Sequence, residues 1–181
     1  MSYPLGLRAA LVAAMAVFAG CSTTTPTATG ALPESLRVPA GEVLALRARG
    51  IGVQIYECRM SAVDPSHFEW VLKAPEAELF DHDGRPIIRH YAGPTWQAAD
   101  GSAVVGVVVA RDNAPDPAAI PWLLLRVDSS SGRGPITHTH SIQRLHTVGG
   151  TAPASGCSAA QAGSEARVHY SADYLFYSAR S

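Results

Sequence analysis

"TWQAADGSAVVGVVVAR", residues Thr95–Arg111, is the stretch that most clearly decides the fold. Two runs of strand-forming residues flank the dipeptide Asp100-Gly101. Asp-Gly is among the strongest short-range signals for a two-residue hairpin turn, because both residues tolerate the positive φ that such turns need. The stretch therefore predicts two antiparallel strands joined by a tight turn.

Period-two patterns extend in both directions from this hairpin. Alternating residues point to opposite faces of a strand, so the alternation of apolar and polar residues predicts half-buried strands. No segment of useful length has the helical period. Strands at intervals of roughly ten residues predict an all-β fold, an antiparallel β-sandwich or barrel of about eight to ten strands. The segments that carry this pattern are GEVLALRARG (41–50), GVQIYECRM (52–60), HFEWVLKA (67–74), AELF (77–80), IPWLLLRVD (120–128) and ARVHYSADYLFYSAR (166–180).

The N-terminus has the features of an export signal. Arg8 precedes the apolar run Ala9–Ala19, which is shorter than the roughly 20 apolar residues of a membrane-spanning helix. The following "VFAGCS" resembles the bacterial lipobox, in which the cysteine is lipidated and becomes the mature N-terminus. We therefore expect a lipoprotein signal peptide over residues 1–20, lipidation of Cys21, a flexible tether over 21–36 and one β-domain over 37–181. Ser22 favours an outer-membrane lipoprotein facing the periplasm, with secretion as the alternative.

The charges limit the partners that the sequence predicts, and the cysteines indicate the compartment. Without Arg8, the chain has 13 basic and 15 acidic side chains and no basic stripe, which argues against nucleic-acid binding. Once Cys21 is assigned to the lipid anchor, Cys58 and Cys157 remain. An even pair in an oxidising compartment is most simply a disulfide. Closing a loop of about 100 residues would stabilise the fold by roughly 4 to 5 kcal/mol in the chain-entropy account.

A group of aromatic and polar residues surrounds the strand break Ala92-Gly93-Pro94. Aromatic rings with a few convergent polar groups are typical of small-molecule sites. The group predicts a groove for a sugar or a peptidoglycan fragment, which would make an envelope glycan, or another envelope protein, the partner. The alternative is that these rings build the core. The candidate groove residues are His90, Tyr91, Trp96, Gln97 and Arg144.

Three histidines lie close together in the sequence. His138 and His140 would share one face of a strand, and an even offset keeps His146 on that face if the strand is straight. Paired imidazoles can hold Zn²⁺ or Cu²⁺, so His138 and His140 are candidate metal ligands. The alternative is a set of solvent-facing histidines on an edge strand. Beyond this pair, the sequence indicates no cofactor.

Other motifs for catalysis or metal binding are absent from the sequence or incomplete. "DHDGRP" (81–86) begins like a calcium loop, but Arg85 stands at the fifth position and Ala92 at the twelfth, which favours a turn. There is no G-x-S-x-G elbow. The absence of a recognisable catalytic set leaves enzymatic activity undecided and favours a non-catalytic role.

Several segments of the chain are distinctive in combination: GVQIYEC, WVLKAPEAELFD, HYAGPTWQAADGSAVVG, IPWLLL, IQR with TVGG, GC and YSADYLFY. Together they resemble a family of secreted bacterial and fungal proteins known only as a domain of unknown function. The resemblance covers Val38–Tyr177 and implies a β-rich extracytoplasmic domain without an established activity. Some fungal members carry a malate-dehydrogenase label, but the G-x-G-x-x-G fingerprint of dinucleotide binding is missing here.

We therefore expect a lipid-anchored envelope module that binds a ligand or has a structural role. The alternative is a metal-dependent periplasmic enzyme that uses His138 and His140.

Overall fold

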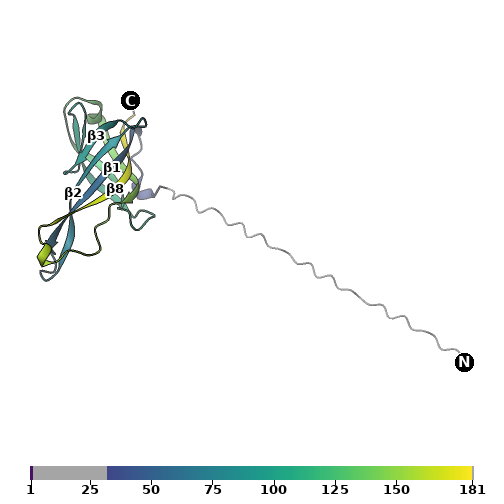
Figure 1. Ribbon diagram of the computed structural model, residues 1–181. Coiled ribbons are helices and arrows are strands. Elements are labelled where there is room, and N and C mark those ends of the chain that lie inside the picture. Colours follow the sequence, from purple (N-terminus) through teal and green to yellow (C-terminus); the bar gives the residue numbers. More distant parts are fainter. Residues whose placement is uncertain (2–31, 181) are drawn as a thin grey trace. The chain divides into compact units, whose positions relative to one another are not determined.

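The protein is described by a computed structural model that covers Met1 and residues 32–180 (Figure 1). Eight antiparallel strands follow one another around a closed barrel, and β8 pairs with β1 to complete the ring. The all-β prediction is confirmed, and the architecture is a barrel of eight strands. The strands are β1 (Glu42–Met60), β2 (Phe68–Phe80), β3 (Pro86–Tyr91), β4 (Thr95–Ala98), β5 (Ala103–Asp112), β6 (Trp122–Ser131), β7 (Thr139–Gly149) and β8 (Glu165–Ala179).

Short 3₁₀ helices supplement the strands. They are η1 (Glu34–Leu36), η2 (Pro135–His138) and η3 (Ala159–Gln161). Within the described residues, no helix is both long and apolar enough to span a membrane.

Two pairs of segments that the sequence pattern predicts as separate strands each form one long strand in the structure. Gly52 lies inside β1, where a side chain would collide with the backbone of Glu76 and with Ala77 on β2. This glycine permits a close approach of two strands and does not make a turn. Pro75 lies inside β2, and β3 pairs with β2 only from Ala77 onward, so the missing N–H interrupts no ladder on that side.

Alternation along each strand separates two apolar clusters. On β6, Leu123 and Leu125 belong to the large cluster inside the barrel, whereas Trp122 and Leu124 belong to a smaller cluster on the outer wall. The strand is therefore buried on both faces, which explains its continuous apolar run.

The outer cluster is covered by residues that precede β1. Leu36 is fully buried against Trp122, Leu124 and Leu175. Its carbonyl oxygen accepts a hydrogen bond of 2.7 Å from Gln143 Nε2. The predicted end of the tether at residue 36 is therefore wrong. The helix η1 already packs on the barrel, because its leucine covers an apolar surface. The predicted signal peptide and Cys21 lie outside the described residues.

The ends of β1, β2 and β8 continue beyond the barrel as an arm (Figure 1). The predicted disulfide is present here, with the Cα atoms of Cys58 and Cys157 5.4 Å apart. Cys58 is fully buried at the end of β1, and Cys157 lies in the long connection between β7 and β8. The bridge therefore ties this connection to the arm.

The two ends of the barrel differ. The closed end consists of the turns 81–85 and 99–102 and the segment 132–138. Ile136 from this segment is 7% exposed and belongs to the interior cluster. The turns carry their own hydrogen bonds: Asp81 Oδ1 accepts from the backbone N–H of Asp83 and of Arg85, as expected for a turn.

The open end lies at the other edge of the same strands. It comprises the β3–β4 turn (92–94), the β5–β6 connection (113–121) and the base of the arm. Ile120 of the β5–β6 connection is buried in the interior cluster at this end, but the packing is incomplete, and a cavity opens there.

Candidate functional site

The cavity at the open end has a volume of about 260 Å³. It extends from exposed residues such as Leu72 and Arg111 inward to the buried rings of Trp96 and Tyr174. Eight-stranded barrels have an interior that side chains fill or that holds one small ligand. This barrel combines the two arrangements, because side chains fill its closed end and its open end contains a cavity. The lining residues are Gln54, Leu72, Lys73, Ala74, Pro75, His90, Ala92, Gly93, Pro94, Trp96, Val108, Arg111, Leu123, Leu125, Arg144 and Tyr174.

Arg144 supplies the positive charge inside the cavity. It lies two residues after Ile142 on β7, so alternation brings its side chain to the inner face. One guanidinium nitrogen, Nη2, donates a hydrogen bond of 2.9 Å to the carbonyl oxygen of Pro121. Its Nε is buried and has no hydrogen-bond partner. The ion pairs found among residues 32–180 do not include Arg144.

His90 and Trp96 form one wall of the cavity. Their rings stack with centroids 4.4 Å apart and an angle of 11° between the planes. His90 Nδ1 lies 2.9 Å from the carbonyl oxygen of Thr95, which can only accept, so Nδ1 carries the proton and Nε2 is left as an acceptor. Burial, aided by the positive charge of Arg144, lowers the pKa of His90 to about 3. His90 is therefore neutral at physiological pH.

Tyrosines line the interior beside this wall. The hydroxyls of Tyr170 and Tyr174 are 3.0 Å apart, and Tyr56 donates a 2.6 Å hydrogen bond to the carbonyl oxygen of Gly150. Burial raises the pKa of Tyr174, and the nearby charge of Arg144 offsets part of that rise. These tyrosines are neutral, so their hydroxyls offer hydrogen bonds and no negative charge.

Hydrogen-bond donors without acceptors are concentrated at the cavity. In the described part of the chain, five buried side-chain nitrogen or oxygen atoms have no partner. Three of them belong to residues that line the cavity, namely Gln54 Nε2, Trp96 Nε1 and Arg144 Nε. Leaving a buried donor unpaired costs about 1 to 3 kcal/mol, and more for a charged group. Donors of this kind are suited to a ligand that supplies acceptors.

The structure divides the candidate groove residues predicted from the sequence. His90, Trp96 and Arg144 come together at the cavity, and the break at Ala92-Gly93-Pro94 forms part of its rim. Tyr91 and Gln97 lie on the outer wall, where the hydroxyl of Tyr91 donates a 3.4 Å hydrogen bond to Gln97 Oε1. Their inclusion in the groove is wrong, because each follows an inward-facing residue on its strand and so faces outward.

Sequence reasoning missed Gln54 as part of the site. Gln54 is 1% exposed and shares the inner face of β1 with Tyr56 and Cys58. A glutamine in phase with a buried tyrosine and a buried cysteine is a signal that could have identified it.

The paired histidines lie at the opposite, closed end. His138 ends η2, and His140 lies on β7, so the expectation that both share one face of a strand is wrong. A register shift between Leu145 and Val148 also breaks the phase to His146, whose φ is 49°. The alternative of an edge strand is wrong as well, because β7 pairs on both sides.

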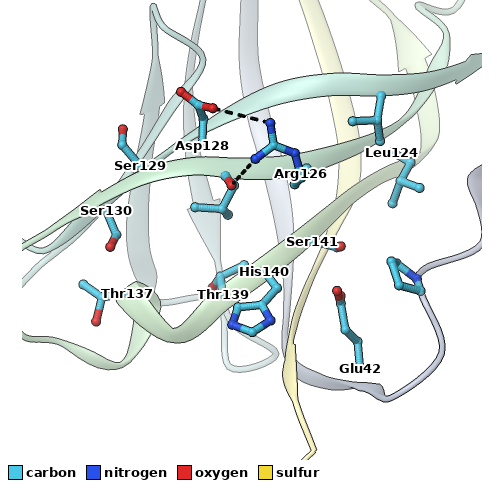
Figure 2. Close-up of a pocket in the computed structure, with 13 residues that line it drawn as sticks. Glu42, Leu124, Arg126, Asp128, Ser129, Ser130, Thr137, Thr139, His140 and Ser141 are labelled. Carbon is cyan, nitrogen blue, oxygen red and sulfur yellow. Dashed lines mark hydrogen bonds and ion pairs between the residues drawn. The ribbon is translucent and has the colours of Figure 1, made fainter.

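His140 lines a groove of about 580 Å³ on the outer wall, where β6 and β7 separate (Figure 2). Glu42, Ser141 and Thr137 line it with His140, and Arg126 lies beside Asp128 with 3.5 Å between Nη2 and Oδ1. Among the residues described, no three His, Cys, Asp or Glu side chains gather closely enough to hold a metal ion. Zinc or copper binding by His138 and His140 stays a prediction, which elemental analysis before and after the double alanine substitution would test.

Comparison with known proteins places the barrel in a family. Residues 39–178, 140 of the 181 residues, match the family model described as "Protein of unknown function (DUF3455)". The chain belongs to the DUF3455 family. The match runs from just before β1 almost to the end of β8, so every residue that lines the open-end cavity lies within the DUF3455 region. No curated protein and no solved structure is detectably similar to the chain.

Proposed function

We propose that the chain is a lipid-anchored binding module of the cell envelope that takes one small molecule into the open-end cavity. The lipobox-like "VFAGCS" supports the anchor and the outer-membrane, periplasm-facing location. The Cys58–Cys157 disulfide is consistent with an extracytoplasmic location.

The observation that carries the binding role is the set of three buried donors without acceptors around the cavity. A barrel evolved for stability alone would pair these groups or replace them with apolar ones, because unpaired buried donors destabilise the folded state. The cavity of about 260 Å³ lies just below the range of roughly 300 to 1,000 Å³ that is typical of sites for drug-sized molecules. The ligand is therefore small.

Saturation-transfer NMR on the full chain in detergent tests this role, with benzoate, benzamide, glucuronate and glucose as probes. We expect transfer to at least one probe. Ala74→Phe places a ring in the cavity lining and should abolish the transfer. Ala62→Phe makes the same change at an exposed position in the β1–β2 connection and should leave it intact. Transfer to none of the probes, or transfer that Ala74→Phe does not alter, contradicts the proposal.

The anchor has a separate test. Cys21→Ser should abolish incorporation of labelled palmitate and release the protein from the membrane fraction, because no acyl chain can then be attached to that side chain. Cys58→Ser should not affect labelling. Acylation that persists in Cys21→Ser would contradict a lipid anchor at this position.

A further inference from the structure

The chemistry of the ligand follows from the charges around the open-end cavity, on the assumption that the cavity is a binding site as proposed above. Three cationic side chains line it, Lys73, Arg111 and Arg144, and no Asp or Glu does. The overall charge of the chain is close to neutral. The positive character is therefore a local property of this end of the barrel.

The three cations are not equivalent. Lys73 is neutralised by ion pairs of 2.6 Å to Glu165 and 3.5 Å to Glu57. Arg111 is exposed on the rim, where water and salt screen its charge. Arg144 lies deeper, its Nη2 donates to a backbone carbonyl oxygen, and no ion pair within residues 32–180 includes it. Of the three, Arg144 is the cation whose charge is neither neutralised by a carboxylate nor located on the exposed rim, so it is the best candidate to bind an anion.

The unpaired groups beside Arg144 have the same preference. Gln54 and Trp96 are each 1% exposed and offer N–H donors, as does the Nε of Arg144. Hydrogen bonds from charged or neutral donors to an oxyanion are shorter and stronger than bonds to a neutral oxygen. A carboxylate supplies several lone pairs from two oxygens and can serve more than one of these donors.

The rest of the lining favours an apolar body. Leu123 and Leu125 form part of it, together with Val108 and Pro94. Trp96 presents no open face as a platform for a sugar ring, because His90 stacks on it and Tyr174 and Phe176 meet it at steep angles. The hydroxyls of a neutral sugar can accept hydrogen bonds from these donors, but they carry no negative charge to pair with Arg144.

We propose that the open-end cavity binds the carboxylate of a small organic acid, with Arg144 as the anion-binding residue, Gln54 and the Trp96 indole N–H as further donors, and the leucines in contact with the apolar body. An aromatic acid and a sugar acid share this carboxylate, and the experiment separates the two sources.

Isothermal titration of the full chain in detergent compares each acid with its neutral counterpart: benzoate with benzamide, and glucuronate with glucose. We expect an acid to bind at least about tenfold more tightly than its neutral counterpart, the factor expected for one charge-assisted hydrogen bond. Tight binding of benzoate alone identifies an aromatic or apolar acid, and tight binding of glucuronate alone identifies a sugar acid.

Substitutions test which residue causes the preference for the acid. Arg144→Gln should weaken binding of the acid about tenfold or more and leave the neutral counterpart within about twofold. Arg144→Lys keeps the charge and should retain part of the preference. Arg111→Gln, on the rim, should cost about two- to threefold, and added salt should remove that difference. The matched control is Arg89→Gln, which removes the same charge from the exposed outer side of β3.

Each outcome decides a separate claim. Equal affinity for acid and neutral counterpart in both pairs overturns the carboxylate proposal and leaves the binding role intact. A preference for the acid that Arg144→Gln does not reduce, in protein whose circular dichroism is unchanged, overturns the assignment to Arg144. If Arg144→Gln does not fold, Arg144→Lys and Arg111→Gln decide, and an unchanged preference in both contradicts the proposal. Binding of none of the four probes contradicts both the carboxylate proposal and the binding role.

Discussion

The same eight strands form the closed end and the open end of this barrel. Side chains fill the interior at the closed end, whereas a cavity remains at the open end. At the closed end, Ile136 completes the interior cluster and the turns satisfy their own polar groups. At the open end, a guanidinium without a carboxylate partner and two unpaired N–H donors face a cavity. Where packing and hydrogen bonding are both incomplete at the same place, that place is expected to serve a function other than stability.

The largest expected difference between the ends concerns packing. Ile136→Ala at the closed end should lower the free energy of unfolding by about 2 to 5 kcal/mol, because a buried side chain leaves a cavity. Leu72→Ala at the open end should change it by less than about 0.5 kcal/mol, since Leu72 is 52% exposed. Urea denaturation of both variants measures this difference, and similar losses would mean that the ends are equally packed.

A pair of buried glutamines sharpens the comparison of hydrogen bonding. Gln143 is 2% exposed and bonded on both sides, to the Leu36 carbonyl oxygen and the Tyr177 hydroxyl. Gln143→Leu should lower the free energy of unfolding by about 1 to 3 kcal/mol, because it leaves these partners unpaired.

Gln54 is equally buried, but its Nε2 has no partner. Gln54→Leu should leave stability unchanged or raise it by about 1 kcal/mol, while it weakens ligand binding. The two variants can be compared in one set of urea denaturation curves. A large loss of stability in Gln54→Leu would show that the donor is satisfied in the folded protein.

A further difference between the ends is the pH dependence that arises from His90. Its pKa is about 3 in the folded protein and near 6.5 when unfolded, so between these values only the unfolded state binds the proton. Stability from this group is therefore complete above pH 6.5 and falls as the pH is lowered, by up to about 1.4 kcal/mol per pH unit.

Replacement of His90 by Gln should flatten the dependence of unfolding free energy on pH between 6.5 and 5. His169→Gln, at an exposed position on β8, is the matched control and should leave the slope unchanged. Equal slopes in wild type and His90→Gln would mean that the buried imidazole is protonated in the folded state.

Part of the candidate site could be predicted from local sequence and part could not. The break at Ala92-Gly93-Pro94 is a local signal, and it identified His90 and Trp96 on the strands beside it. The same reasoning included Tyr91 and Gln97, because proximity in sequence does not tell which alternate residue faces inward. It also placed His138 and His140 on one strand, whereas the chain forms a 3₁₀ turn at the first of them.

The sequence by itself determined that the chain forms antiparallel strands, that a hairpin lies at Asp100-Gly101 and that Cys58 pairs with Cys157, because these depend on local periodicity, turn chemistry and a count of cysteines. Only the tertiary structure decided which face of each strand is inside, how β8 meets β1 and that Gln54, His90 and Arg144 share one cavity. Those properties arise when the sheet closes on itself. Closure sets register and orientation for all eight strands together, and no single segment of the chain contains that information.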